Sequence, residues 1–196
     1  LVAIQDVPKP SSKDAIKELK ARGLMTVMLT GDNKRVAQAI ADEVGIDRVI
    51  AEVMPNDKAQ QIKELQDKGK KVAFVGDGIN DAPALSTADV GIAMGSGTDI
   101  AIDSGGIVLV RNDLRGVVRA LDISKKTFNR IKLNLFWALI YNVIGIPIAA
   151  GLFAFVGFTL SPELAGLAMA FSSVSVVSSS LLLNKTKIAG DHVVQA

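Results

Sequence analysis

The feature that most restricts the fold of this chain is a long stretch that carries almost no charge. Charged residues make up 21% of the 196 residues, yet Glu163 is the only one between residues 133 and 183. Two runs of roughly 20 mostly apolar residues, 133–152 and 164–183, lie in this stretch, and a helix of that length spans about 30 Å, enough to cross a bilayer. Lysines and arginines bracket the pair on both outer ends, which predicts a membrane hairpin with both ends in the cytoplasm. A hairpin of buried helices in a soluble protein is the alternative.

The part of the chain before residue 123 instead alternates short apolar runs with segments of helical spacing. Strands that alternate with helices indicate an α/β fold with a parallel sheet and helices on both faces. A capping box at 11–14 predicts the start of the first helix, and Pro55 predicts the start of the third. The apolar runs that we expect to be strands are 1–4, 25–29, 49–53, 72–75, 90–94 and 107–110.

Composition excludes several classes of function. The net charge of +2 is too small to indicate a nucleic-acid-binding protein. The absence of cysteine excludes disulfides and thiolate metal sites within this chain. The chain opens in an apolar run without an initiating methionine, and we therefore expect it to be a C-terminal piece of a longer protein.

The loop after the run at 72–75 contains two carboxylates, Asp77 and Asp81. Ligands of open α/β sheets gather at the carboxyl ends of parallel strands, and carboxylate oxygens suit Mg²⁺, so these side chains are candidates for a magnesium site. Gly76 and Gly78 would let the backbone turn sharply and approach a ligand closely. A solvated Asp-Gly turn after a strand is the alternative interpretation.

Two other predicted strand ends carry residues suited to phosphate. Thr30 offers a hydroxyl, and Gly31 offers a backbone N–H at the start of a helix, where anions are favoured. Lys58 lies in the first turn of the third predicted helix, where a cation is unfavourable for the helix dipole. We therefore expect Lys58 to point at a ligand phosphate, with an ordinary surface lysine as the alternative.

The order of these motifs, TGD at 30–32, PNDK at 55–58 and GDGINDAP at 76–83, resembles that of the phosphorylation domain of P-type ATPases. The resemblance implies a partial haloacid-dehalogenase-like fold, an α/β fold with a Rossmann-type parallel sheet, followed by a two-helix transmembrane hairpin. It also implies ATP as substrate, Mg²⁺ as cofactor and a phospho-aspartate intermediate, with the phosphoryl group held by Thr30 and Lys58. The catalytic residues that it implies are Thr30, Gly31, Asp32, Lys58, Asp77, Asn80 and Asp81, of which Asp77 and Asp81 would bind Mg²⁺ with support from Asn80.

One departure from the family pattern determines what this chain can do alone. The acceptor aspartate of the family lies in the sequence DKTGT, and that sequence is absent here. We therefore expect the acceptor, the nucleotide-binding and actuator domains and the earlier membrane helices to lie upstream in the same protein, and the chain alone to be inactive. The expected boundaries are 1–122 for the C-terminal part of the phosphorylation domain, 123–184 for the last two membrane helices and 185–196 for a cytoplasmic tail.

Polar residues lie deep within both predicted spans. Tyr141 and Asn142 in the first span and Met169 and Ser173 in the second fall at similar depths, and the latter two share one helical face. Polar groups at that depth mark a transport path or hold helices together, and chemistry alone does not separate the two. The four residues resemble the last two helices of copper(I)-transporting heavy-metal ATPases, which implies a copper(I) site between the spans. A thioether suits copper(I), and no acidic residue, as zinc exporters of this family carry, lies inside either span.

The sequence thus predicts the C-terminal part of an ATP-driven copper(I) exporter in the cell membrane, with residues 1–132 and 185–196 in the cytoplasm. The expected partners are the remainder of the same ATPase, the lipid bilayer and a copper chaperone, and no nucleic acid. A P-type ATPase for another cation is one alternative. A membrane-anchored phosphatase-like remnant that acts only as a binding module is the other, and a DKTGT strand upstream would exclude it.

Overall fold

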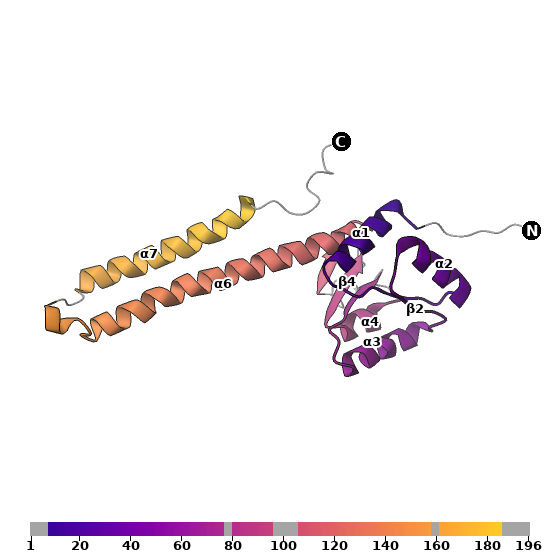
Figure 1. The fold of residues 1–196 in the computed structure, drawn as a ribbon, viewed down its shortest axis with the longest axis horizontal. Helices are drawn as coiled ribbons and strands as arrows, with labels where there is room; N and C mark the ends of the chain where they lie inside the picture. Colours follow the sequence, from indigo (N-terminus) through magenta and orange to yellow (C-terminus); the bar gives the residue numbers. More distant parts are fainter. Residues whose placement is uncertain (1–7, 77–79, 96–105, 158–160, 186–196) are drawn as a thin grey trace, which may run out of the picture. The chain divides into compact units, whose positions relative to one another are not determined.

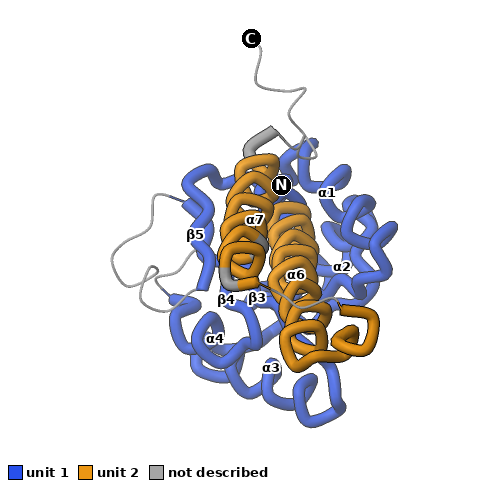
Figure 2. The backbone as a smooth tube through the Cα atoms, turned by 90° about the vertical axis from the view of Figure 1, so that its left-hand side faces the viewer, with its two compact units in different colours: residues 1–119 blue, residues 120–196 orange. Residues whose placement is uncertain are grey.

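A computed structural model describes residues 8–76, 80–95, 106–157 and 161–185. The chain divides into two compact units, Leu1–Arg119 and Ala120–Ala196 (Figure 2). The predicted strand at 1–4 and the candidate site residue Asp77 lie outside the described residues.

Unit 1 alternates helices and strands, as the sequence predicts (Figure 1). Each strand pair is parallel, which confirms the predicted α/β class. The elements are α1 (Pro10–Ala21), β1 (Val27–Leu29), α2 (Lys34–Val44), β2 (Arg48–Ile50), the 3-10 turn η1 (Pro55–Asp57), α3 (Lys58–Asp67), β3 (Ala73–Gly76), α4 (Ala82–Thr87), β4 (Val90–Met94) and β5 (Ile107–Leu109).

The described strands form two parallel sheets rather than the single sheet expected. One has the order β1-β2, and the other has the order β3-β4-β5. Within the described residues β1 and β3 therefore each keep one edge that no strand pairs. Such an edge presents a row of backbone N–H and C=O groups that can pair with another strand.

The helix boundaries follow local backbone chemistry. The capping-box prediction at 11–14 is wrong, because α1 already begins at Pro10, whose fixed φ suits the first helical position, and Lys9 makes no side-chain cap. Asn33 caps α2 by accepting a 3.0 Å hydrogen bond from the N–H of Val36. Pro55 starts η1, which leads into α3, as predicted.

One packed apolar cluster of unit 1 lies between α4 and the three-stranded sheet. Leu85 of α4 and Ala93 of β4 are fully buried, and Phe74 and Val108 from the neighbouring strands pack against them. Gly116 lets the first turn of the next helix lie close to Leu109, since a Cβ there would lie 3.1 Å from that side chain. The carboxyl end of β3 is thus anchored by a packed helix–sheet contact.

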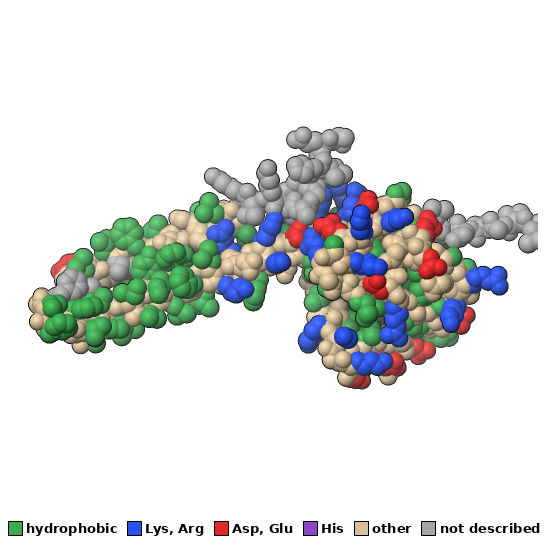
Figure 3. All heavy atoms as spheres, in the orientation of Figure 1, with side chains coloured by type: hydrophobic (Ala, Val, Ile, Leu, Met, Phe, Trp, Pro, Cys, Tyr) green, Lys and Arg blue, Asp and Glu red, His purple; other side chains and the backbone are tan. Residues whose placement is uncertain are grey.

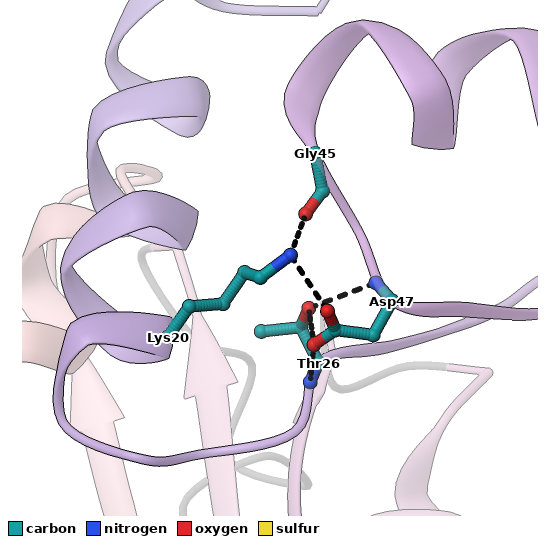
Figure 4. A network of polar contacts seen from close by, with 4 residues as sticks. All are labelled: Lys20, Thr26, Gly45 and Asp47. Atoms are coloured by element: carbon teal, nitrogen blue, oxygen red, sulfur yellow. Dashed lines mark hydrogen bonds and ion pairs between the residues drawn. The ribbon is translucent and has the colours of Figure 1, made fainter.

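Asp47 ties together α1, the start of β1 and the end of α2 (Figure 4). Its carboxylate lies 2.6 Å from the Lys20 ammonium and accepts 2.9 Å hydrogen bonds from the N–H and the hydroxyl of Thr26. Lys20 also donates to the Gly45 carbonyl at 2.9 Å. The hydrogen bond from Lys20, followed by those from Thr26, lowers the pKa of Asp47 from 3.8 to about 2.

Asp89 makes a similar connection on the other sheet. Its carboxylate accepts hydrogen bonds from Lys71 at 2.8 Å, from the N–H of Val72 at 2.9 Å and from Gln66 at 3.1 Å. These bonds, chiefly that from Lys71, hold the pKa of Asp89 well below its ordinary value. The end of α3 and the start of β3 are thereby fixed to the turn between α4 and β4.

Unit 2 consists of two long helices joined by a short connection. The helix α6 (Arg115–Ala149) begins within unit 1, and α7 (Pro162–Leu181) follows the 3-10 turn η2 (Ala154–Val156) and leads into η3 (Leu182–Lys185). Both long helices are long and apolar enough to cross a membrane. Figure 3 shows apolar side chains covering them, while the charged side chains gather on unit 1 and near the start of α6.

The first predicted span, at 133–152, ends with α6 at Ala149 and contains Pro147 without a break in the helix. Side chains join the helices: Arg130 donates a hydrogen bond to Ser179 at 3.1 Å, and the Asn134 amide donates one to Ser180 at 2.8 Å.

Candidate functional site

The candidate residues of unit 1 follow the carboxyl ends of β1 and β3, where open α/β sheets bind ligands. Thr30 comes directly after β1 and Asp81 lies five residues after the end of β3, at the start of α4. Lys58 is the first residue of α3.

Residues 30–32, which we term the threonine loop, form a tight turn. The Thr30 hydroxyl donates to the Asp32 carboxylate at 2.9 Å and accepts from the Asp32 N–H at 3.1 Å. Gly31 is exposed between them. The structure thus brings three of the predicted site residues into one loop directly before α2.

The threonine loop is fastened to the segment that follows β2. The N–H of Thr30 donates to the Ile50 carbonyl at 3.1 Å, and the N–H of Val53 donates back to the Thr30 carbonyl at 3.1 Å. The N–H of Glu52 donates to the Asp32 carbonyl at 3.0 Å. Backbone pairing therefore continues past the ends of β1 and β2 and holds the loop in place.

Lys58 and Asp81 form an ion pair at 2.6 Å, with 17% and 12% of their side chains exposed. Asp81 precedes α4 but makes no side-chain cap, so it forgoes a local hydrogen bond that stabilises a helix by about 1 kcal/mol. Lys58 is a cation at a helix N-terminus, where the dipole opposes it. A buried pair of this kind adds little net stability, although removal of one partner costs about 3–5 kcal/mol. Local stabilisation therefore does not explain the arrangement.

Gly76 makes room for the Asp81 carboxylate. A Cβ at Gly76 would lie 2.5 Å from the Asp81 Oδ2, which no side chain can tolerate without movement. The sequence interpretation, in which this glycine lets the backbone approach a ligand, is therefore incomplete. Gly76 is needed first because it lets Asp81 face Lys58.

The remaining predicted residues of unit 1 are placed less fully. Asn80 is exposed next to Asp81, and Asp77 lies outside the described residues. The described part of the chain has no group of three or more Asp, Glu, His or Cys side chains that could hold a metal ion.

The predicted membrane residues lie on the faces of α6 and α7. The Asn142 amide donates a hydrogen bond to the Ala138 carbonyl at 3.0 Å, and the Ser173 hydroxyl donates one to the Met169 carbonyl at 3.2 Å, so both donors bind the backbone of their own helix. Met169 is 72% exposed, and Ser173 is exposed on the same face. The copper(I) site between the spans that the sequence implies stays a prediction.

Glu52 is a residue of the site region that the sequence analysis missed. It has φ of +60°, a left-handed conformation that costs a residue with a side chain about 1–2 kcal/mol. Glutamate is not a residue type that signals this conformation, so the sequence contains no local indication of it.

Comparison with known proteins places these features in a family. A family model described as haloacid dehalogenase-like hydrolase matches residues 1–89. The chain is 59% identical over 186 residues to a probable copper-transporting ATPase, PacS, of Synechocystis sp., covering 94% of this chain and 25% of the relative. It is 59% identical over 184 residues to a probable copper-exporting P-type ATPase of Archaeoglobus fulgidus, covering 93% of this chain and 23% of the relative. The chain thus spans about a quarter of the length of these relatives.

Two solved structures of related ATPases are also similar to this chain. The crystal structure of a zinc-transporting PIB-type ATPase in the E2·Pi state superposes with a TM-score of 0.79 at 39% identity, covering 91% of this chain and 28% of that one. The catalytic domain of the CPx-ATPase CopB-B matches with a TM-score of 0.53 at 40% identity, covering 61% of this chain and 47% of that one.

Proposed function

The chain belongs to the P-type ATPases, and from this premise we propose that it supplies part of the phosphorylation domain and the last membrane hairpin of a pump that exports copper(I). The observation that carries the proposal is the buried Lys58–Asp81 pair at 2.6 Å, at the carboxyl end of β3. A lysine and a carboxylate held there against their local helix preferences suit the binding of a phosphoryl group and a cation.

In this proposal Lys58 and Thr30 hold the phosphoryl group, and Gly31 and Asp32 shape the loop around it. Phosphoryl transfer needs mainly positioning and charge stabilisation, which a lysine ammonium, a hydroxyl and backbone N–H groups provide. The hydrogen bonds that fasten the threonine loop support this role, because they fix Thr30 before a ligand arrives.

Mg²⁺ fits the donor set of the acidic loop. Mg²⁺ keeps several waters and needs only one or two carboxylates besides phosphate, so Asp81 and Asp77 suffice without a larger cluster, with Asn80 in support. Bound there, the ion would neutralise charge on the transferring phosphoryl group. Asp81 is held by Gly76 and Lys58 with its carboxylate at the end of β3.

We place the acceptor aspartate on a strand of the same protein outside this chain. The unpaired edges of β1 and β3 within the described residues support this, since a parallel strand between them would join the two sheets and end beside Thr30 and Asp81. ATP is then the phosphoryl donor, and the nucleotide-binding and actuator domains and the earlier membrane helices are the partners.

Copper(I) is the cargo that the membrane half favours, with Tyr141, Asn142, Met169 and Ser173 as ligands shared with other helices. The exposure of Met169 and Ser173 on one face of α7 leaves them available to those helices. No carboxylate lies in α6 beyond Asp122 or in α7 beyond Glu163, which disfavours a hard cation. A copper chaperone on the cytoplasmic side and the lipid bilayer complete the set of partners.

Phosphoenzyme formation tests the proposal. In the full-length protein that contains this chain, Asp81→Asn should lower the acid-stable phosphoenzyme formed from ATP and copper(I) by about tenfold or more, because the site loses a charge that fixes Lys58 and Mg²⁺. Asp67→Asn, at the exposed end of α3, is the control and should leave the level unchanged. The proposal would be contradicted if the wild-type protein formed no phosphoenzyme. It would also be contradicted if Asp81→Asn and Asp67→Asn changed the phosphoenzyme level equally.

A further inference from the structure

Glu52 is the only non-glycine residue with positive φ in the described part of the chain. Such a conformation persists in a folded protein only where the surrounding structure determines it, and these conformations gather at functional sites. Glu52 lies between β2 and η1, on the segment that leads to Lys58. Its conformation therefore needs an explanation beyond the path of the chain.

The left-handed turn at Glu52 directs two successive N–H groups at the threonine loop. The N–H of Glu52 reaches the Asp32 carbonyl at 3.0 Å, and that of Val53 reaches the Thr30 carbonyl at 3.1 Å. The Val53 carbonyl in turn lies against Gly31, since a Cβ added there would be 3.4 Å from it. The turn thus contacts all three residues of the threonine loop through its backbone.

The side chain of Glu52 adds a contact that glycine would lack. Its Oε1 lies 3.5 Å from the N–H of Lys34, the first residue of α2. A carboxylate is favoured at a helix N-terminus, and Asn33 already caps the N–H of Val36. Glycine would adopt this conformation with less strain. A carboxylate that links the turn to α2 explains why the chain has glutamate there.

We propose that Glu52 is a positioning residue for the phosphoryl-binding loop. Its strained turn holds the threonine loop through backbone hydrogen bonds, and its carboxylate fixes that assembly to the first turn of α2. Thr30 and Gly31 then keep the geometry that binds a phosphoryl group before the ligand arrives, without contact between Glu52 and the ligand. This inference rests on the proposed function of the same site.

Three substitutions in the full-length protein separate the backbone from the carboxylate. Glu52→Gly keeps the turn and removes the carboxylate, Glu52→Ala removes the carboxylate and keeps the strain, and Glu52→Gln keeps an oxygen acceptor. We expect Glu52→Gly and Glu52→Ala to raise the concentration of inorganic phosphate for half-maximal phosphorylation by about fivefold, and Glu52→Gln to restore most of the affinity. The KM for ATP should change less than the half-maximal concentration of inorganic phosphate in all three, because ATP is also held by the nucleotide-binding domain that we place outside this chain.

Thermal stability distinguishes positioning from a purely structural role. Glycine relieves the strain, so Glu52→Gly should melt at or above the wild-type temperature while binding phosphate more weakly. Asp67→Gly is the matched control and should leave phosphate affinity unchanged. Wild-type phosphate affinity in Glu52→Gly, or no rescue by Glu52→Gln, overturns this inference alone. If neither ATP nor inorganic phosphate phosphorylates the wild-type protein, both this inference and the proposed function are wrong.

Discussion

Three aspartates of unit 1 each pair with a lysine that is distant in the sequence, and the three pairs differ in their exposure. The Lys20–Asp47 and Lys71–Asp89 pairs keep at least 25% of each side chain exposed, whereas the Lys58–Asp81 pair is exposed by 17% and 12%. Exposed ion pairs are screened by water and add little stability. The carboxylates of Asp47 and Asp89 also each accept a hydrogen bond from a backbone N–H group. Only Asp81 is held in a low-dielectric setting, which suits chemistry with charged ligands.

The Asp47 network should give unit 1 an acid-dependent stability. The pKa of Asp47 falls from 3.8 to about 2 on folding, so its contribution is complete above about pH 4 and is lost as the pH falls through 2. Asp47→Asn should therefore lower the melting temperature of the full-length protein in detergent at pH 6, and the difference from wild type should shrink between pH 4 and pH 2. The control Asp67→Asn should show no such convergence, and a constant difference for Asp47→Asn across this range would contradict the assignment.

Met169 should be the dominant copper(I) ligand of this chain. Met169→Leu nearly conserves volume and removes the thioether, so we expect copper(I) affinity to fall by about tenfold with little change in melting temperature. Met54→Leu is the matched control, because Met54 is similarly exposed, at 68% against 72%, but lies in unit 1. Unaltered copper(I) affinity in a folded Met169→Leu protein would reduce the role of this residue to helix packing.

At the scale of elements, periodicity predicted the alternation of helices and strands well. The strand at 90–94 was placed without error, since its apolar run is bounded by clear turns. The division into two sheets was not predictable, because pairing across the open edges depends on strands that the described residues do not include. The first helix start was misplaced because two start signals compete there, and Pro10 prevails over the capping box.

The sequence predicts the candidate site as a set of residues, but it does not predict the contacts among them. The TGD motif follows β1 and the GDGINDAP motif begins at the last residue of β3, so Thr30 and Asp81 lie after the carboxyl ends of these strands. The pairing of Lys58 with Asp81 depends on the path of α3 and β3 over the 23 residues between them, and local sequence does not encode it. Glu52 was missed because its conformation is imposed by the threonine loop and not by its residue type.

The α6–α7 hairpin should depend on the hydrogen bond between Asn134 and Ser180. The Ser180 hydroxyl accepts from the Asn134 amide at 2.8 Å and donates to the Val176 carbonyl at 2.9 Å. The Asn134 Oδ1 is buried and has no partner among the described residues. Ser180→Ala would therefore leave this amide unsatisfied, and we expect a loss of about 0.6–2 kcal/mol in the stability of the full-length protein in detergent.

A second substitution identifies the source of that loss. In Asn134→Leu the buried amide is absent, so adding Ser180→Ala should cost less than it does in wild type. Ser178→Ala, at an exposed position of α7, is the control and should have little effect. Additive effects of Asn134→Leu and Ser180→Ala would show that the hydrogen bond does not couple the helices.

At the scale of the whole molecule, one continuous helix links the two chemistries of the chain. Val117 and Val118 bury the first turns of α6 in unit 1, and the same helix then runs to Ala149 in the apolar unit. Helical backbone, and not a loop, therefore connects the polar unit to the apolar unit.

The charge pattern around α6 predicts a membrane topology that can be tested. The lysines and arginines at 125–132 predict that unit 1 lies in the cytoplasm and that the connection between α6 and α7 lies outside. The chain has no cysteine, so single cysteines can be introduced in a full-length protein whose other cysteines are replaced. Phe155, in η2, is 82% exposed, and Lys68 is exposed at the end of α3. In intact cells an impermeant maleimide should label Phe155→Cys and not Lys68→Cys, and after permeabilisation it should label both. Labelling of Lys68→Cys alone in intact cells would show that the hairpin has the opposite orientation. Unit 1 would then lie outside the cell, where it could not use cytoplasmic ATP.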